Sequence, residues 1–276
     1  MVPSDKPVDR RPRQDRRRRC AQDMQHLSEM QAHFVAATGE FVGTFMFLFF
    51  AYATQLMVLD QTSSVAPPAM ETVYVSLGYG FSLLVTVWAF YRISGGLFNP
   101  AVVLGMCLSG QLPWMRAAFL VPTQIISCMA AGGVVKAMFP GDMESLNTTL
   151  APGMNIAQGL FAEMFFTSYL VFVVLMLAAE KSKDTFIAPV GIGLALFVAE
   201  LPGVYFTGGS LNPVRSFGCA VAALSFPKYH WIYWLGPALG AFVGAGYFRF
   251  VKMCHYEEAN PGQDESEPEP EPEQNV

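Results

Sequence analysis

Apolar runs separated by short polar or turn-rich segments dominate the middle of the chain. An α-helix needs about 20 mainly apolar residues to cross roughly 30 Å of hydrocarbon. Six runs are long enough, so the pattern predicts six transmembrane helices. They cover residues 34–59, 72–92, 115–138, 158–179, 187–206 and 230–251.

Two shorter apolar segments lie between these runs, at residues 99–109 and 212–224, and both begin with Asn-Pro. Both are too short to cross a membrane. Non-helical backbone at membrane depth is tolerated only where it is buried in protein or lines a cavity. Interrupted segments at matching places in two halves are typical of a substrate path. We therefore expect two half-helices that line a pore.

The two halves of the chain repeat each other. Residues 98–102 (Phe-Asn-Pro-Ala-Val) correspond to residues 211–215 (Leu-Asn-Pro-Val-Arg). Likewise, Glu40 near the start of the first run corresponds to Glu163 near the start of the fourth. Each half contains three spans, so the second half enters the membrane from the opposite side. The pattern predicts an all-α membrane fold with an inverted repeat. The two halves cover about 33–139 and 157–252.

Charged residues make up only 14% of the chain and hydrophobic residues 53%, whereas a soluble protein averages about 25% charged residues. The charges gather at the ends: residues 1–30 contain eight Lys and Arg, and residues 257–276 contain eight Asp and Glu. We therefore expect a six-helix pore domain at 33–254 between two disordered cytosolic tails, a basic one at 1–32 and an acidic one at 255–276. The basic tail could also bind anionic lipid or act as an address.

The distribution of Lys and Arg predicts that both termini are cytosolic. The basic tail, Arg92 and the loop around Lys181 would lie on one side of the membrane, whereas loop 60–71 lacks Lys and Arg and would lie on the other. Two lysines, Lys136 and Lys228, disagree weakly with this orientation.

The predicted outer loop at 140–157 carries an Asn-Thr-Thr sequon at Asn147, which predicts N-glycosylation there and agrees with this orientation. No transit peptide or lipidation signal is present. The plasma membrane is therefore the default expectation, with an internal membrane left open.

The Asn-Pro motifs predict a pore for small neutral molecules. Asn99 and Asn212 suit the helix N-cap, and Pro100 and Pro213 suit the first helical position. Inverted symmetry brings the two helix N-termini together near the bilayer centre, where each carries roughly half a positive charge. The asparagine amides can donate hydrogen bonds to the oxygen of a water molecule. The positive field disfavours cations and protons at the same place.

Residues 93–102 (Ile-Ser-Gly-Gly-Leu-Phe-Asn-Pro-Ala-Val) and 207–218 (Thr-Gly-Gly-Ser-Leu-Asn-Pro-Val-Arg-Ser-Phe-Gly) resemble the two pore motifs of the aquaporin, or major intrinsic protein, family. The resemblance covers residues 33–252, and the residues of the first motif resemble those of fungal members. It implies the aquaporin fold and a homotetramer in the lipid bilayer with one pore per subunit. The usual third residue of each family motif is alanine. The first motif keeps it as Ala101, whereas the second motif has Val214 in its place.

Four residues resemble the water-conducting members of the family rather than the glycerol-conducting ones. Ser216 stands where glycerol-conducting relatives usually carry Asp, and Ala220 stands where they carry Lys or Arg. Tyr233 and Trp234 match the aromatic pair of the sixth span in water-conducting members. The resemblance therefore implies a water-type pore.

The resemblance also places the family's outer selectivity filter on four residues, Tyr79, Glu200, Gly209 and Arg215. Arg215 would offer donors to water and repel cations. The other three depart from the usual pattern. Tyr79 replaces Phe, Glu200 replaces the His of water-specific members, and Gly209 is smaller than the usual Cys or Thr.

Glu200 is the departure with the largest expected consequence, because an acid at membrane depth is a functional candidate. We expect an ion pair with Arg215 that pulls the guanidinium aside. In the alternative, Glu200 points away from the pore and forms hydrogen bonds with the backbone. A filter without His and with Gly209 would be more open or more polar, so hydrogen peroxide or ammonia could follow water.

The resemblance further implies that the acids Glu40 and Glu163 accept hydrogen bonds from the loops that carry Asn99 and Asn212. A proton relay is the alternative role. No ionisable residue lies nearby in the sequence to continue such a relay.

These observations predict a passive channel for water, with hydrogen peroxide or another small neutral solute as a further substrate. The alternatives are an ion-coupled transporter, a channel for ammonia or glycerol, and a closed protein with a junctional role. The sequence contains no Ser/His/Asp, phosphate-binding or metal-ligand constellation, and its five cysteines show no metal or redox spacing. We expect no enzymatic activity, no cofactor, no bound metal and no nucleic-acid partner.

Overall fold

The computed structural model describes residues 27–62, 68–180, 182–259 and 261 of the chain. Within these ranges the protein is helical and contains no strand. Six long helices form the body, and two short helices follow the Asn-Pro motifs. The long helices are α2 (Glu29–Thr62), α3 (Pro68–Phe90), α5 (Trp114–Met138), α6 (Ile156–Val174), α7 (Ala188–Phe206) and α9 (Ile232–Met253). The short helices are α4 (Pro100–Leu108) and α8 (Pro213–Ala223). Single turns form η1 (Met143–Leu146), η2 (Leu175–Ala179), η3 (Lys183–Ile187) and α10 (Tyr256–Ala259).

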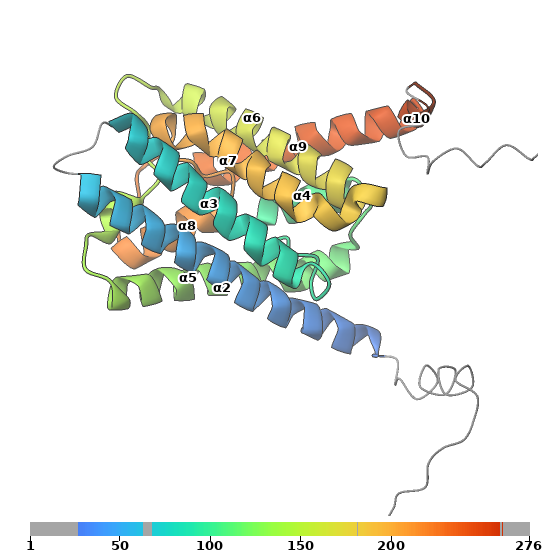
Figure 1. Cartoon of the computed structure of the whole chain (residues 1–276), viewed down its shortest axis with the longest axis horizontal. Coiled ribbons are helices and arrows are strands. Elements are labelled where there is room, and N and C mark those ends of the chain that lie inside the picture. Colours follow the sequence, from blue (N-terminus) through green and yellow to red (C-terminus); the bar gives the residue numbers. More distant parts are fainter. Residues whose placement is uncertain (1–26, 63–67, 181, 260, 262–276) are drawn as a thin grey trace, which may run out of the picture.

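The long helices lie side by side as a bundle (Figure 1). Helix α2 begins and α9 ends at the same end of this bundle, which we call the terminal end. The loop between α5 and α6, which contains η1, lies at the other end, which we call the loop end. An even number of spans returns the chain to its starting side, so this arrangement agrees with six predicted crossings.

Five helical segments of the described chain are long and apolar enough to cross a membrane, namely α2, α3, α5, α6 together with η2, and α7. Helix α9 has a comparable length of 22 residues and carries glycines at 236, 240 and 244. Those glycines allow close packing on α6. A Cβ at Gly240, for example, would lie 2.6 Å from the carbonyl oxygen of Met164. Small residues at helix crossings are typical of membrane proteins.

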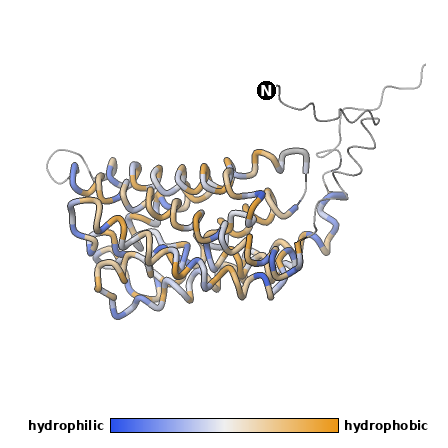
Figure 2. The backbone as a smooth tube through the Cα atoms, turned by 90° about the horizontal axis from the view of Figure 1, so that it is seen from below, coloured by the Kyte–Doolittle hydropathy of each residue, from blue (hydrophilic) through white to orange (hydrophobic). Residues whose placement is uncertain are grey.

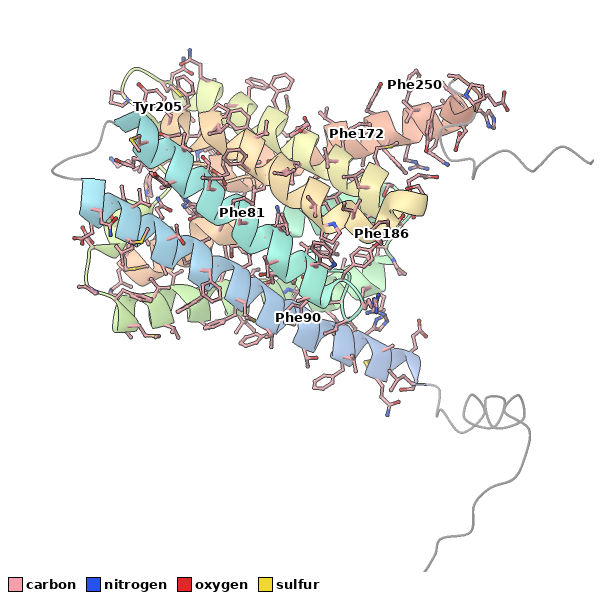
Figure 3. All side chains as sticks on the ribbon, in the orientation of Figure 1. Phe81, Phe90, Phe172, Phe186, Tyr205 and Phe250 are labelled. Carbon is pink, nitrogen blue, oxygen red and sulfur yellow. The ribbon has the colours of Figure 1, made fainter. Side chains whose placement is uncertain are left out.

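Large apolar side chains cover the outer surface of the bundle. Phe81, Tyr205 and Phe250, marked in Figure 3, are 53%, 62% and 53% exposed. Hydrophobic residues occur along the whole length of the bundle, whereas α10 is hydrophilic (Figure 2). Such a surface suits contact with lipid rather than with water.

The helix boundaries differ from the predicted ones at the two tails. Helix α2 begins at Glu29, inside the segment predicted as the basic tail, and α10 lies inside the predicted acidic tail. Lys252 links α10 to the bundle, because its Nζ lies 2.6 Å from Oε1 of Glu257 and 3.1 Å from Oε1 of Glu180. This contact holds α10 near the end of η2. The predictions of disorder for 1–26 and 262–276 lie outside the described residues.

Two adjacent glycines in α5 provide a matched test of the helix packing. A Cβ at Gly132 would lie 2.7 Å from the carbonyl oxygen of Gly218 in α8, whereas a Cβ at Gly133 would meet no atom within 4 Å. We expect Gly132→Ala to lower the free energy of unfolding by about 1–3 kcal/mol, because backbone must move. Gly133→Ala should leave it unchanged or raise it slightly. Thermal unfolding of the purified variants measures the difference, and equal shifts would contradict this packing.

Candidate functional site

The two short helices meet through their N-terminal asparagines. Asn99 caps α4 and Asn212 caps α8, because each Oδ1 accepts a hydrogen bond from the N–H two residues later, at 2.8 and 3.1 Å. The Nδ2 of Asn99 also donates to the carbonyl oxygen of Leu211 at 2.9 Å. In the symmetric bond, the Nδ2 of Asn212 donates to the carbonyl oxygen of Phe98 at 2.9 Å. An amide has two N–H groups, so each asparagine keeps one donor beyond this cross-link.

The residue before each asparagine adopts an unusual backbone conformation. Phe98 has a φ of 49° and Leu211 a φ of 50°, in the left-handed region. For a residue with a side chain, such a conformation costs about 1–3 kcal/mol and persists only where its surroundings enforce it. The two cross-links supply part of that enforcement, and two buried acids supply the rest.

The first acid, Glu40, is fully buried beneath the loop before α4. Its two carboxylate oxygens accept hydrogen bonds from the backbone N–H groups of Leu97 and Phe98, at 3.0 and 2.9 Å. They also accept hydrogen bonds from the Ser94 hydroxyl and the Gln124 side-chain amide, each at 2.7 Å. Four donors therefore converge on this one carboxylate.

The second acid, Glu163, repeats this arrangement under the loop before α8. It accepts hydrogen bonds from the N–H groups of Ser210 and Leu211, at 3.0 and 2.8 Å, and from the Thr207 hydroxyl at 2.6 Å. Because both acids are occupied by donors from the loops, the geometry suits a structural support rather than a proton relay.

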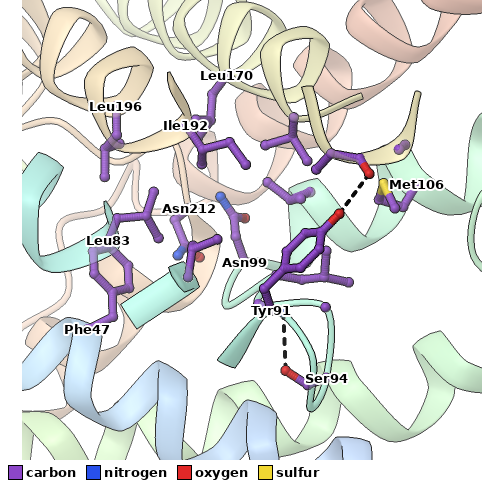
Figure 4. Close-up of a pocket in the computed structure, with 18 of the residues that line it drawn as sticks. Phe47, Leu83, Tyr91, Ser94, Asn99, Met106, Leu170, Ile192, Leu196 and Asn212 are labelled. Carbon is purple, nitrogen blue, oxygen red and sulfur yellow. Dashed lines mark hydrogen bonds between the residues drawn. The ribbon is translucent and has the colours of Figure 1, made fainter. Parts of the chain in front are cut away.

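A cavity of 320 Å³ passes the two asparagines. Figure 4 shows Asn99 and Asn212 close together along its length. Toward the terminal end it is lined by Tyr91, whose hydroxyl donates to the carbonyl oxygen of Ala178 at 2.9 Å. Much of the remaining wall is aliphatic, formed by Leu83, Val87, Val102, Leu170, Val174, Ile192 and Leu196.

Toward the loop end, the cavity is lined by Tyr79, Glu200 and Arg215. The Arg215 side chain is 1% exposed and donates from Nη1 to the carbonyl oxygen of Leu146 at 3.0 Å. Its Nη2 donates to Oε1 of Gln55 at 3.0 Å, and its Cζ lies 4.7 Å from the centre of the Tyr79 ring. The Tyr79 hydroxyl donates to the same Gln55 oxygen at 2.8 Å.

Glu200 is fully buried and lies directly against Gly209, where a Cβ would be only 1.8 Å from Oε2 of Glu200. Neither carboxylate oxygen of Glu200 has a hydrogen-bond partner among the described residues. The predicted ion pair with Arg215 is therefore wrong, because the guanidinium donates to Leu146 and Gln55 instead. The alternative of hydrogen bonds from Glu200 to the backbone is also wrong.

Comparison with known proteins decides which family this geometry represents. The model of the major intrinsic protein family matches residues 26–248. The chain belongs to this family. It is 68% identical over 243 residues to probable aquaporin-3 of Gibberella zeae, covering 87% of this chain and 85% of that protein. It is 55% identical over 247 residues to aquaporin-7 of Botryotinia fuckeliana, covering 87% of this chain but only 54% of that relative.

The fold of this aquaporin-family protein is similar to the X-ray structure of the aquaglyceroporin from Plasmodium falciparum. The TM-score is 0.72 at 18% identity, covering 82% of this chain and 99% of that chain. At this identity the likeness shows the fold alone. Together the comparisons confirm the predicted family, the relation to fungal aquaporins and the all-helical aquaporin fold. The protein is a multi-pass membrane channel for water or small solutes, not an enzyme.

The four residues that resemble water-conducting aquaporins lie behind the pore wall. Ser216 donates to the Ser210 hydroxyl at 2.6 Å, and Tyr233 donates to the carbonyl oxygen of Thr207 at 2.8 Å. Ala220 is buried, and Trp234 packs edge-on against Phe217. None of the four lines the 320 Å³ cavity, and two of them, Ser216 and Tyr233, contact the loop before α8.

The other motif residues of this aquaporin-family chain occupy the first turns of the half-helices. Helices α4 and α8 begin at Pro100 and Pro213. The backbone N–H groups of Ala101 and Val214 donate the hydrogen bonds that the capping asparagine oxygens accept. Val214 is fully buried and is absent from the lining of the cavity. Its extra bulk relative to alanine is therefore accommodated by packing outside the pore.

The predicted glycosylation site, Asn147, is buried in the structure. The Asn147 side chain is 8% exposed, and its Nδ2, the atom that would carry a glycan, donates to the carbonyl oxygen of Ser225 at 3.1 Å. Asn147 directly follows Leu146, whose carbonyl oxygen binds Arg215. Attachment of a glycan would require this segment to move away from Arg215 and Ser225.

Sequence reasoning missed Gln55, Tyr52 and the Leu146 carbonyl, all of which hold Arg215. The Tyr52 hydroxyl donates to the carbonyl oxygen of Arg215 at 2.7 Å. One signal was available, because Gln55 is an amide inside the first apolar run, where a polar side chain needs a partner or a wet path. The contact with Leu146 is made by its backbone carbonyl, so no residue type in the sequence indicates it.

Proposed function

We propose that this aquaporin-family protein conducts water passively, in single file, and excludes ions and protons. The observation that carries the proposal is the pair of cross-linked asparagines at the N-termini of α4 and α8, beside one 320 Å³ cavity. Each asparagine keeps one N–H for the oxygen of a passing water. Both helix N-termini add a positive potential there, which disfavours cations and protons.

Hydrogen peroxide is the proposed second solute. It carries two hydroxyl donors, and Glu200 offers two buried carboxylate oxygens without a partner among the described residues. The Nε of Arg215 is likewise a buried donor without a described partner. A solute that both donates and accepts at close range would satisfy these groups better than an apolar molecule.

We further propose that the protein assembles as a homotetramer in the plasma membrane with both termini in the cytosol. The Lys and Arg distribution supports the orientation. A channel closed at rest is the second candidate, because Gln55, Tyr79 and Arg215 are joined by hydrogen bonds at the loop end of the cavity.

Stopped-flow light scattering on proteoliposomes tests the water pore. We expect fast shrinkage with a low activation energy for the wild type, and at least about tenfold slower shrinkage for Asn212→Ala, which loses both its lumen donor and its cross-link. Phe81→Ala, on the exposed surface, is the matched control and should behave like the wild type. Wild-type rates equal to those of empty liposomes would contradict an open pore and favour the closed candidate.

The same vesicles test peroxide. Glu200→His removes the two free acceptors, so the peroxide-to-water permeability ratio should fall by about threefold or more. Equal ratios for Glu200→His and the wild type would contradict peroxide as the second solute, while leaving the water pore intact.

A further inference from the structure

Gln55 lies where two cavities come close without joining. The 320 Å³ cavity includes Tyr79 and Arg215 in its lining. A second cavity of 280 Å³ is lined by Gln55, Val75 and Asn147 among others, and therefore opens toward the loop end. The two cavities share no lining residue. The contact of Gln55 with Tyr79 and Arg215 is thus part of the barrier between them.

The hydrogen bonds of this barrier have only one arrangement. A guanidinium carries donors only, so the Gln55 atom that faces Nη2 of Arg215 at 3.0 Å must be its carbonyl oxygen. The Tyr79 hydroxyl, 2.8 Å from that oxygen, must then donate to it as well. An amide oxygen has two lone pairs, so Gln55 holds both partners at once. The Arg215 guanidinium also lies over the Tyr79 ring, which adds a cation–π contact.

The three side chains that form this arrangement are all buried. Gln55 is 7% exposed, and Tyr79 and Arg215 are each 1% exposed. Solvent outside the bundle therefore hardly reaches these hydrogen bonds, and competition for them comes from molecules in the cavity that Tyr79 and Arg215 line. A phenylalanine at position 79 could not donate to Gln55, so the tyrosine at this position and the glutamine in α2 form a matched pair.

We propose that Gln55 is a positioning residue that sets the aperture and solute preference of the constriction, by holding the Tyr79 hydroxyl and the Arg215 guanidinium on one oxygen. The proposal rests on the proposed channel function. Held in this way, one N–H of Arg215 Nη2 and the Tyr79 hydroxyl are withheld from the solute. A polyol such as glycerol needs both more width and more donors than water, so the bridge discriminates against it. Releasing the bridge frees two donors and lets the guanidinium swing aside.

The experiment measures the glycerol-to-water permeability ratio of proteoliposomes. Gln55→Ala should raise the ratio by about fivefold, the change that corresponds to losing one hydrogen bond's net contribution. Tyr79→Phe should raise it in the same direction but less, because Arg215 stays bound. Gln55→Glu keeps an acceptor oxygen for both partners and should raise the ratio less than Gln55→Ala does. Met57→Ala, on the same helix with its side chain 49% exposed, is the control for nonspecific effects.

A purely structural role for Gln55 would change the melting temperature without moving the solute ratio. Unchanged ratios in folded Gln55→Ala and Tyr79→Phe would overturn the proposal while leaving the channel function intact. If the wild type conducts neither solute, conduction by Gln55→Ala would support the bridge as a closed latch, and silence in both would overturn it. If Gln55→Ala does not fold, Tyr79→Phe decides, since it removes a single hydroxyl from the bridge.

Discussion

Glu163→Ala is expected to prevent folding of the channel rather than to slow conduction. The substitution leaves the N–H groups of Ser210 and Leu211 without their acceptor, and leaves the Thr207 hydroxyl only the carbonyl oxygen of Gly203 at 3.2 Å. Each buried donor that loses its partner costs about 1–3 kcal/mol, and a buried cavity adds to that. The total approaches the whole stability of a typical domain, about 5–15 kcal/mol. Leu211 also has a left-handed φ of 50°, which its contacts must enforce.

The measurement is the yield and melting temperature of monodisperse protein in detergent. Glu163→Gln keeps one acceptor oxygen and should lie between the wild type and Glu163→Ala. Glu29→Ala removes an exposed acid from the first turn of α2 and should behave as the wild type. By the repeat, Glu40→Ala should be at least as damaging, because four donors converge on Glu40. A folded Glu163→Ala with the wild-type melting temperature would show that the loop before α8 does not depend on this acid.

Gly209→Ala is expected to disable the filter unless Glu200 is shortened at the same time. The added Cβ would lie 1.8 Å from Oε2 and 2.8 Å from Cδ of Glu200, so the carboxylate must move. Glu200 already lines the cavity, and a displaced side chain has the lumen as its available space. We expect water permeability to fall by at least about tenfold, equivalent to a barrier increase of roughly 1.4 kcal/mol. Part of the damage is local, because Gly209 has a φ of 62° that disfavours alanine by about 1–2 kcal/mol.

A double-mutant cycle separates the two causes. Glu200→Ala combined with Gly209→Ala removes the clash but keeps the backbone strain, so permeability should recover in part. The coupling between the two positions in unfolding free energy should reach about 0.5–3 kcal/mol. Strictly additive effects on permeability and melting temperature would mean that Glu200 and Gly209 do not share one space.

Much of the fold followed from local pattern. The long apolar runs predicted the helices because crossing hydrocarbon requires continuous apolar length and internally satisfied backbone. The Asn-Pro pairs predicted the half-helices because capping and the missing proline N–H are properties of neighbouring residues. The observed starts at Pro100 and Pro213 agree with those predictions.

The sequence predicted the selectivity filter only in part. Tyr79, Glu200 and Arg215 line the loop-end part of the cavity, and Gly209 lies against Glu200 without lining the cavity, but the predicted pairing of Glu200 with Arg215 was wrong. An ion pair between an acid and an arginine is a reasonable expectation from charge alone. It fails because Arg215 is already held by a carbonyl oxygen and by the amide of another helix.

The sequence by itself determined the membrane spans, the two half-helices, the inverted repeat and the family. Only the tertiary structure decided that Gln55 holds Arg215, that Glu200 fills the space left by Gly209, and that Asn147 is buried. The physical reason is the range of the interactions. Spans and caps depend on residues within a few positions of one another, whereas Gln55 and Arg215 are 160 positions apart and meet only when the helices pack.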